Sequence, residues 1–394
     1  MDDDDYFIYN LRNTNHPNPC FEVNKKLNQL VKTDKNYLAA ISFSHRMELD
    51  DIKPNIVSFN ILINCYCLLR RMGSTFSIFG KIFKMGYYPG IITLNTLMKG
   101  LCLHGRINEA KWFHKKLVAH GYELNHLTYG TLINALCKRR ETGAAIQLLR
   151  QAERENVSLN VVLYNTIIDS LCKENRVTDA FDLYNEMVLK YKISLSPNVV
   201  TYNTLINGLC IAGQLKEAYE LLNKMVSKYI KPDVYTFDIM VEALCKEGKV
   251  DEAQIVIDEM MVQVEVEPDV VIFNSFMHGC FVGNQPNKAK DTFDSMDQRG
   301  VTPDIHSYSY TIMIKELCKI KRVDEASNLF EEIRSKNMTP DAKSTLVLLM
   351  VCSNLGETHV LQSLLTRCMI KDYQPMYSLR VTRFSEFLRG VVLY

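Results

Sequence analysis

The sequence predicts an all-α solenoid of helix–turn–helix repeats, each about 35 residues long. The first observation is a Leu-Cys dipeptide that recurs at nearly constant spacing, with one double interval near the C-terminal end. The second is that apolar residues within each period follow helical spacing. The third is a Pro-Asp, or an equivalent pair, that closes most periods. The dipeptides contain Cys102, Cys137, Cys172, Cys210, Cys245 and Cys318.

The stretch Val199–Asp233 shows how each repeat is built. Its first half has apolar residues at helical spacing, Gly213 interrupts them, and a second helical pattern follows. Pro232 ends that second helix, because a proline disfavours helical conformation in the residue before it. Two helices of roughly 12 residues each are marginal alone, so neighbouring repeats must bury one another's apolar faces.

This period divides the chain into an array with degenerate ends. The array holds eight repeats at residues 56–90, 91–125, 126–160, 161–198, 199–233, 234–269, 270–304 and 305–341. We expect a degenerate capping repeat at 21–55, a degenerate C-terminal repeat at 342–376, an extension at 1–20 and a tail at 377–394. Extra residues near 189–196, 263–267 and 307–310 are expected to lie in turns.

Composition narrows the possible functions. The 394 residues carry a formal net charge of +1, so bulk electrostatics does not indicate a nucleic-acid ligand, although one face of a solenoid can still be basic. Most of the 12 cysteines recur once per repeat, which is typical of small buried hydrophobes in a reducing compartment. No Cys-x-x-Cys pair occurs, so we expect no metal and no cofactor. No stretch is apolar enough to cross a membrane.

Two polar positions recur along the array. Five of the eight repeats have asparagine at position 5, inside the first helix, where asparagine is a mediocre helix former. We therefore expect position 5 to form a polar surface kept for contact. Position 35 is always Asn, Asp or Gly, directly before the next repeat's first helix, and helix capping alone would also explain that choice. Lysine at position 13 likewise has two explanations: it could contact a phosphate, or its charge could interact favourably with the dipole at the C-terminal end of the helix.

The repeats resemble the pentatricopeptide repeat family over roughly residues 21–376. The resemblance rests on segments such as VVTYNTLINGLC and DVYTFDIMVEALCKEGKVDEAQIVIDEM, and their phrasing is similar to the P-class, fertility-restorer-like branch of plants. The tetratricopeptide array is the most similar alternative fold. Its first helix carries a Trp and Gly-Tyr signature that is absent here. The resemblance implies a right-handed superhelical solenoid that binds single-stranded RNA in mitochondria or plastids, one base per repeat. It implies roles in RNA processing, stability or translation.

The resemblance also implies which residues meet the RNA. Positions 5 and 35 recognise the base edge in the pairs Asn60/Gly90, Asn95/Asn125, Gly130/Asn160, Asn165/Asn198, Asn203/Asp233, Asp238/Asp269, Asn274/Asp304 and Thr311/Asp341, with Ser309 as the rival to Thr311. Position 2 sandwiches the base through Val57, Ile92, Leu127, Val162, Val200, Tyr235, Val271 and Tyr308. Position 13 offers Lys138, Lys173, Lys246 and Lys319 to phosphates, whereas Leu68, Leu103, Ile211 and Val282 leave that series incomplete.

The family's pairings give an expected target. Asn/Asp pairs are linked to U, Asn/Asn pairs to a pyrimidine and Thr/Asp pairs to G, which gives 5′-NYNYUNUG-3′. The pairs beginning with Asn60, Gly130 and Asp238 depart from these combinations and assign no base.

Two other functions are weighed against RNA binding. A helical scaffold for protein partners would not need polar positions 5 and 35 in register, and a protein effector is a possible partner in addition to RNA. A deaminase-type enzyme would need a His-x-Glu with a Cys-x-x-Cys, which this sequence lacks, so we expect no catalysis and no small-molecule substrate. The acidic start Met-Asp-Asp-Asp-Asp is unlike a transit peptide, so the mitochondrial location, with the plastid as alternative, rests on the resemblance.

Overall fold

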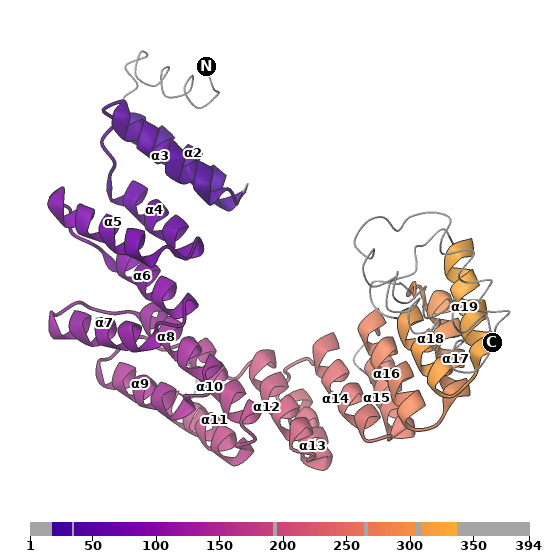
Figure 1. The fold of residues 1–394 in the computed structure, drawn as a ribbon. Helices are drawn as coiled ribbons and strands as arrows, with labels where there is room; N and C mark the ends of the chain where they lie inside the picture. The colour runs from indigo at the N-terminus through magenta and orange to yellow at the C-terminus, as the bar shows by residue number, and fades with distance from the viewer. Residues whose placement is uncertain (1–17, 34, 192–194, 264–266, 304–308, 337–394) are drawn as a thin grey trace, which may run out of the picture. The chain divides into compact units, whose positions relative to one another are not determined.

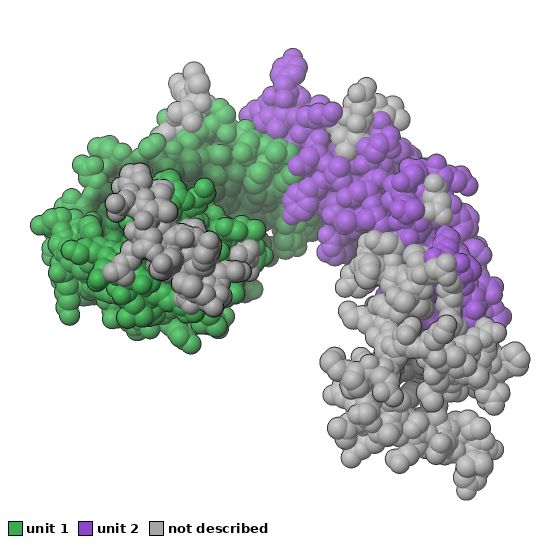
Figure 2. Space-filling model, turned by 90° about the horizontal axis from the view of Figure 1, so that it is seen from above, with its two compact units in different colours: residues 1–213 green, residues 214–394 purple. Residues whose placement is uncertain are grey.

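The structure, a computed structural model, describes residues 18–33, 35–191, 195–263, 267–303 and 309–336 (Figure 1). These residues form eighteen α-helices and one short 3₁₀-helix, Asp297–Arg299, and no strand occurs among them. The chain divides into two compact units, residues 1–213 and 214–394 (Figure 2). The described chain is therefore the helical-repeat solenoid that the period predicts. No helix in the described ranges is long and apolar enough to span a membrane.

In the first unit, helices alternate between two layers. The first helix of each repeat packs on the first helix of the next, as α4 does on α6 and α10 on α12, and each second helix packs back on its own first helix (Figure 1). The helices are α2 Pro19–Lys32, α3 Tyr37–Leu49, α4 Ile56–Leu68, α5 Met72–Lys84, α6 Ile91–Leu103, α7 Ile107–Ala119, α8 His126–Lys138, α9 Thr142–Arg154, α10 Val161–Lys173, α11 Val177–Tyr191 and α12 Val199–Ile211.

The second unit repeats this arrangement. Its first helices α14, α16 and α18 pack on one another in sequence, and each also packs on the second helix that follows it. The helices are α13 Leu215–Ser227, α14 Val234–Lys246, α15 Val250–Gln263, α16 Val270–Val282, α17 Pro286–Met296, α18 Ser309–Lys319 and α19 Val323–Ser335.

Helix starts follow the predicted frame closely. The seven first helices from α4 to α16 begin at the first residue of the predicted repeats and are each 13 residues long. In many repeats, the second residue after the helix end has positive φ, as at Gly86, Gly105 and Asn175. A left-handed residue after the last turn lets the chain reverse and satisfies carbonyls at the helix end.

The recurrent cysteine has a packing partner in the next repeat. Position 12 of one first helix faces position 10 of the next, where a Cβ on Gly208 would lie 2.4 Å from the Sγ of Cys172. Gly279 has the same relation to Cys245, at 2.2 Å. A thiol at one position and a glycine at the other therefore let adjacent first helices approach closely.

Three boundaries differ from the sequence prediction. Helix α2 begins at Pro19, two residues before the predicted start of the degenerate repeat at residue 21. The extra residues predicted near 189 to lie in a turn instead extend α11 to Tyr191. Ser309 and Tyr310 belong to α18, because both are buried in the stack.

The predicted site residues Asp304, Tyr308 and Asp341, the repeat at 342–376 and the tail at 377–394 lie outside the described residues.

Candidate functional site

Position 35 of each repeat caps the first helix of the next. Asn55, Asn125, Asn160, Asn198, Asp233 and Asp269 each accept backbone N–H groups of the following turn through a side-chain oxygen. Gly90, the N-cap of α6, has no side chain to do so. The capping role that composition suggested is therefore present in the structure. It leaves open a second role for the same side chains.

Position 5 is less exposed than the sequence predicts. Asn165, Asn203, Asn274 and Thr311 are each at most 8% exposed, so the expectation that position 5 forms an open polar surface is wrong for these repeats. The reason is stacking: position 5 of one first helix lies against the start of the next first helix, which covers it. The fifth residue is thus part of the contact between repeats.

A recurrent hydrogen-bond arrangement explains how these amides are buried. At the Asn165 junction, Thr201 Oγ1 donates to Asn165 Oδ1 at 2.9 Å, and Asn165 Nδ2 donates to Asn198 Oδ1 at 3.4 Å. We call this set of a fifth-position amide, an N-cap amide and a third-position hydroxyl the amide–hydroxyl triad. Asn95 forms the same triad with Thr128 and Asn125. The triad satisfies polar atoms that burial would otherwise leave unpaired.

The three pairs that assign no base lack the triad. At the first, Asn60 faces Gly90 and Thr93, and both Asn60 Oδ1 and Thr93 Oγ1 are buried without a hydrogen-bond partner among the described residues. At the second, Gly130 lies against Leu163, whose Cδ2 would be 3.1 Å from a Cβ on that glycine. These departures from the family's pairs therefore coincide with departures from the geometry of the Asn95 and Asn165 junctions.

The third such pair begins with Asp238. Its carboxylate accepts a hydrogen bond from Ser275 Oγ at 3.3 Å, from position 6 of the next helix instead of position 3. Burial, and then the neighbouring Glu242 carboxylate, raise the pKa of Asp238 above its ordinary value. A charged aspartate at this partly buried position is therefore less favourable than the neutral asparagine of the triads.

Sequence reasoning missed a further member of the series. Asn24, in α2, donates to Asn55 Oδ1 at 3.1 Å and accepts from Ser58 Oγ at 2.7 Å. These are the contacts of a fifth-position asparagine, although a repeat starting at residue 21 would put Lys25 at position 5. The spacing from Asn24 to Ser58, 34 residues, lies within the range of 33 to 36 residues that separates position 5 from the next position 3 at the Asn95 and Asn165 junctions, and it was the available signal.

The contacts of Ser309 fix the register of the last described first helix. Ser309 Oγ donates to Asn274 Oδ1 at 2.7 Å and the residue is fully buried, as third-position hydroxyls are. Thr311, two residues later, therefore takes the fifth position in α18, and Ser309 does not.

Position 2 presents a series of exposed apolar side chains next to the capped helix starts. The exposed fraction runs from 45% for Val57 to 68% for Ile92. The described members are Val57, Ile92, Leu127, Val162, Val200, Tyr235 and Val271. One exposed aliphatic or aromatic residue at the same place in consecutive repeats offers flat apolar contacts in register.

The position-13 lysines are exposed but mostly engaged. Lys173 pairs with Asp169, Lys246 with Glu242 and Lys319 with Glu316, each at 2.6–2.7 Å. Lys138 has no ion pair among the described residues; Asn134 stands four residues before it, where α10 and α14 carry an acid. Exposed pairs of this kind contribute about 0.3–0.5 kcal/mol, so a phosphate can compete for the lysines.

The recurrent thiols are poorly suited to chemistry. Burial raises the pKa of the Cys172 and Cys245 thiols to about 12. All ten cysteines in the described ranges are free, in keeping with packing between helices rather than nucleophilic attack.

Known repeat families match most of this array. The family model described as PPR repeat family matches residues 89–138, 197–246, 268–310 and 308–354. A model described as pentatricopeptide repeat domain matches 27–68 and 42–102, and two described as PPR repeat match 127–157, 155–188 and 235–263.

Relatives from plants carry the same repeats. A pentatricopeptide repeat-containing protein of Arabidopsis thaliana is 32% identical over 88 residues, which cover 22% of this chain and 14% of the relative. Another from the same plant, named mitochondrial, is 36% identical over 64 residues, covering 16% of this chain and 10% of that protein. The matched segments therefore span a small part of these relatives.

Solved structures share the fold. The crystal structure of the pentatricopeptide repeat protein PPR10 from maize has a TM-score of 0.60 and 21% identity, covering 89% of this chain and 49% of that chain. The same maize protein in complex with an 18-nucleotide psaJ RNA element has a TM-score of 0.42 and 20% identity, over 91% of this chain and 50% of that one. This chain thus spans about half the length of the maize protein.

Proposed function

The chain belongs to the pentatricopeptide repeat family, and from that premise we propose that it binds single-stranded RNA, one base to each repeat. The observation that carries the proposal is the exposed apolar ladder at position 2, set beside capped helix starts with Asn or Asp at positions 5 and 35. Unstacked bases have apolar faces and polar edges. Position 2 offers an apolar contact to the faces, and positions 5 and 35 offer hydrogen bonds to the edges. The maize protein that shares this fold has been solved with RNA.

The triads define what each recognition site offers. In a triad the fifth-position amide is held by two neighbours, so its orientation is fixed before RNA arrives. A pre-oriented amide loses little entropy when it meets a base edge. We propose that the pairs beginning with Asn95, Asn165, Asn203, Asn274 and Thr311 discriminate bases, that those beginning with Asn60, Gly130 and Asp238 do not, and that Asn24/Asn55 adds a pyrimidine contact on the 5′ side.

We propose that the protein works in mitochondria, on organellar transcripts, without catalysis of its own. The support is that relatives carrying the same repeats are named mitochondrial. Bound RNA would be protected, blocked or presented to a protein effector.

Selection from a random single-stranded RNA pool tests the proposal. The expected result is enrichment of 5′-NYNYUNUG-3′ preceded by a pyrimidine, with no base preference at the first, third and sixth positions of NYNYUNUG. A triple variant, Ile92→Ser, Leu127→Ser and Val162→Ser, should then weaken binding of the selected RNA by at least about tenfold, or about 1.4 kcal/mol. Val226→Ser with Ile255→Ser, two exposed apolar changes on second helices, is the control and should leave affinity unchanged. No enrichment and no binding at low salt would contradict RNA recognition and favour a protein-binding scaffold.

A further inference from the structure

The turn between the two helices of each repeat contains a residue in the left-handed region. This residue is position 15, and most repeats place glycine or asparagine there, as at Gly105, Asn175 and Gly213. These residue types tolerate positive φ best. Arg70 and Arg140 take the same conformation, both with φ +59°. An arginine is strained at such a position relative to glycine. The conformation of the turn therefore does not explain why arginine occurs there.

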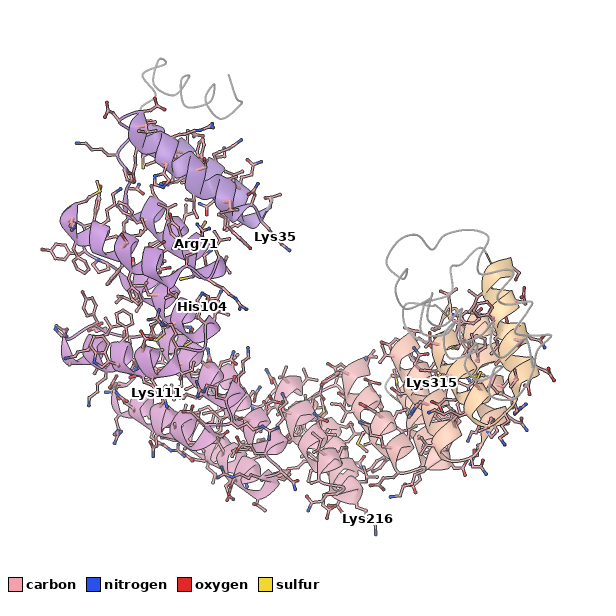
Figure 3. All side chains as sticks on the ribbon, viewed as in Figure 1. Lys35, Arg71, His104, Lys111, Lys216 and Lys315 are labelled. Carbon is pink, nitrogen blue, oxygen red and sulfur yellow. The ribbon has the colours of Figure 1, made fainter. Side chains whose placement is uncertain are left out.

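Basic side chains gather in and beside the turns at the start of the first unit. None of them has an ion pair among the described residues, and Figure 3 shows Lys35, Arg71 and His104 on the same edge of successive repeats. We call these residues the basic edge: Lys35, Arg70, Arg71, His104, Lys138 and Arg140. Arg106 and Arg139 are nearby, but each already pairs with a carboxylate, of Glu109 and Glu141 respectively.

The following turns lack this feature. Arg176 pairs with Asp179 at 2.6 Å, and Lys249 pairs with Glu247 at the same distance. The turns at 212–214 and 283–285 contain no charged residue. Lys321, with φ +65°, repeats the pattern in the last described turn. Unpaired positive charge at position 15 is therefore a property of particular repeats and not of the turn itself.

The basic edge also has a hollow. It has a volume of about 490 Å³ and is lined by Arg70, Met72, Leu103, His104 and Arg106. Both ring nitrogens of His104 are buried beside it without a hydrogen-bond partner among the described residues. Buried imidazole nitrogens normally have one. A hollow with arginines and an unpartnered imidazole is suited to an anion.

The location of the basic edge fits the RNA backbone. Position 13, where other repeats carry lysine, is Leu68 and Leu103 in the first two repeats, and the arginines follow within a few residues. Position 13, where the first helices end, lies about 12 Å along the helix from position 5, at 1.5 Å per residue, and position 15 follows in the turn beyond it.

We propose that the basic edge binds the phosphates of the 5′ part of the bound RNA and, in the first two repeats, takes the place of the absent position-13 lysines. This inference rests on the proposed function. Phosphate contacts set affinity and salt dependence but carry no sequence information. The basic edge therefore anchors the RNA, whereas the triads select its sequence.

The test compares salt dependence in the full chain. Arg70→Gly with Arg140→Gly should lower the magnitude of the log Kd against log[salt] slope by about 1.4, since each lost contact with a single strand removes about 0.7. The base preferences of the selected RNA should stay the same. The melting temperature should not fall, because glycine relieves the strained backbone at both turns.

The matched control is Lys216→Gln with Lys224→Gln, which removes two exposed cations from α13 and should leave the slope unchanged (Figure 3). A slope equal to that of the control, in a chain that still binds its RNA, would overturn the basic edge alone. A wild-type chain that binds no RNA would instead contradict the proposed function, and the basic edge would fall with it.

Discussion

At two junctions in the first unit, position 5 packs against the next first helix in different ways. Between α10 and α12, Asn165 is buried in a triad with Thr201 and Asn198. Between α8 and α10, Gly130 takes the same position and lies against the Leu163 side chain. Both pairs of helices stack directly. The fold therefore does not require an amide at position 5, which is consistent with the base recognition that we propose for it.

The largest expected effect comes from breaking a triad. Asn165→Leu removes the two buried hydrogen bonds that Asn165 makes with the Thr201 hydroxyl and the Asn198 amide. We expect a loss of about 1–3 kcal/mol in the free energy of unfolding, measured by denaturant titration. Asn134→Leu, at an exposed site on α8, is the control and should change stability by less than about 0.5 kcal/mol. Equal effects from both variants would show that the triad contributes nothing specific.

The opposite experiment builds a triad at the apolar junction. Gly130→Asn alone should lower the free energy of unfolding by about 1 kcal/mol, because its side chain meets Leu163 at close range. Adding Leu163→Thr makes room and supplies the third-position hydroxyl. The double variant should recover stability and gain a pyrimidine preference at the third base of the target, measured by repeating the RNA selection. Recovered stability without any new preference would separate the triad from base recognition.

A smaller effect is expected at Asp238, and it depends on pH. Because its folded-state pKa is raised, the folded protein holds this proton more tightly than the unfolded chain. The site therefore costs stability once pH rises above the ordinary pKa of aspartate. Asp238→Asn should raise the free energy of unfolding at pH 7 by up to about 1 kcal/mol, and the gain should vanish near pH 3. A gain that persists at pH 3 would show that charge is not its cause.

The sequence predicted the array well and its contacts poorly, for a physical reason. Period and apolar spacing fix where each helix starts, so the starts at Ile56, Ile91 and Val199 follow directly from the frame. Spacing along one chain does not show which neighbouring repeat covers a side chain. Burial of Asn165, the role of Asn24 and the backbone strain at Arg70 became visible only when the repeats were stacked.

The central claim is that positions 5 and 35 choose the base, and the Asn165/Asn198 pair offers the most direct measurement. The resemblance to the family links Asn/Asn to a pyrimidine and Thr/Asp to G. The double variant Asn165→Thr with Asn198→Asp keeps a hydroxyl to meet Thr201 and a capping carboxylate for α12. Its stability should therefore change little.

Affinities of the wild type and this double variant should be measured for RNAs that differ only at the fourth base of the target. We expect the preferred base to change from a pyrimidine to G, with about 1–3 kcal/mol between matched and mismatched RNA and no change at neighbouring bases. An equal loss of affinity for every RNA, or an unchanged preference for a pyrimidine, would contradict the claim.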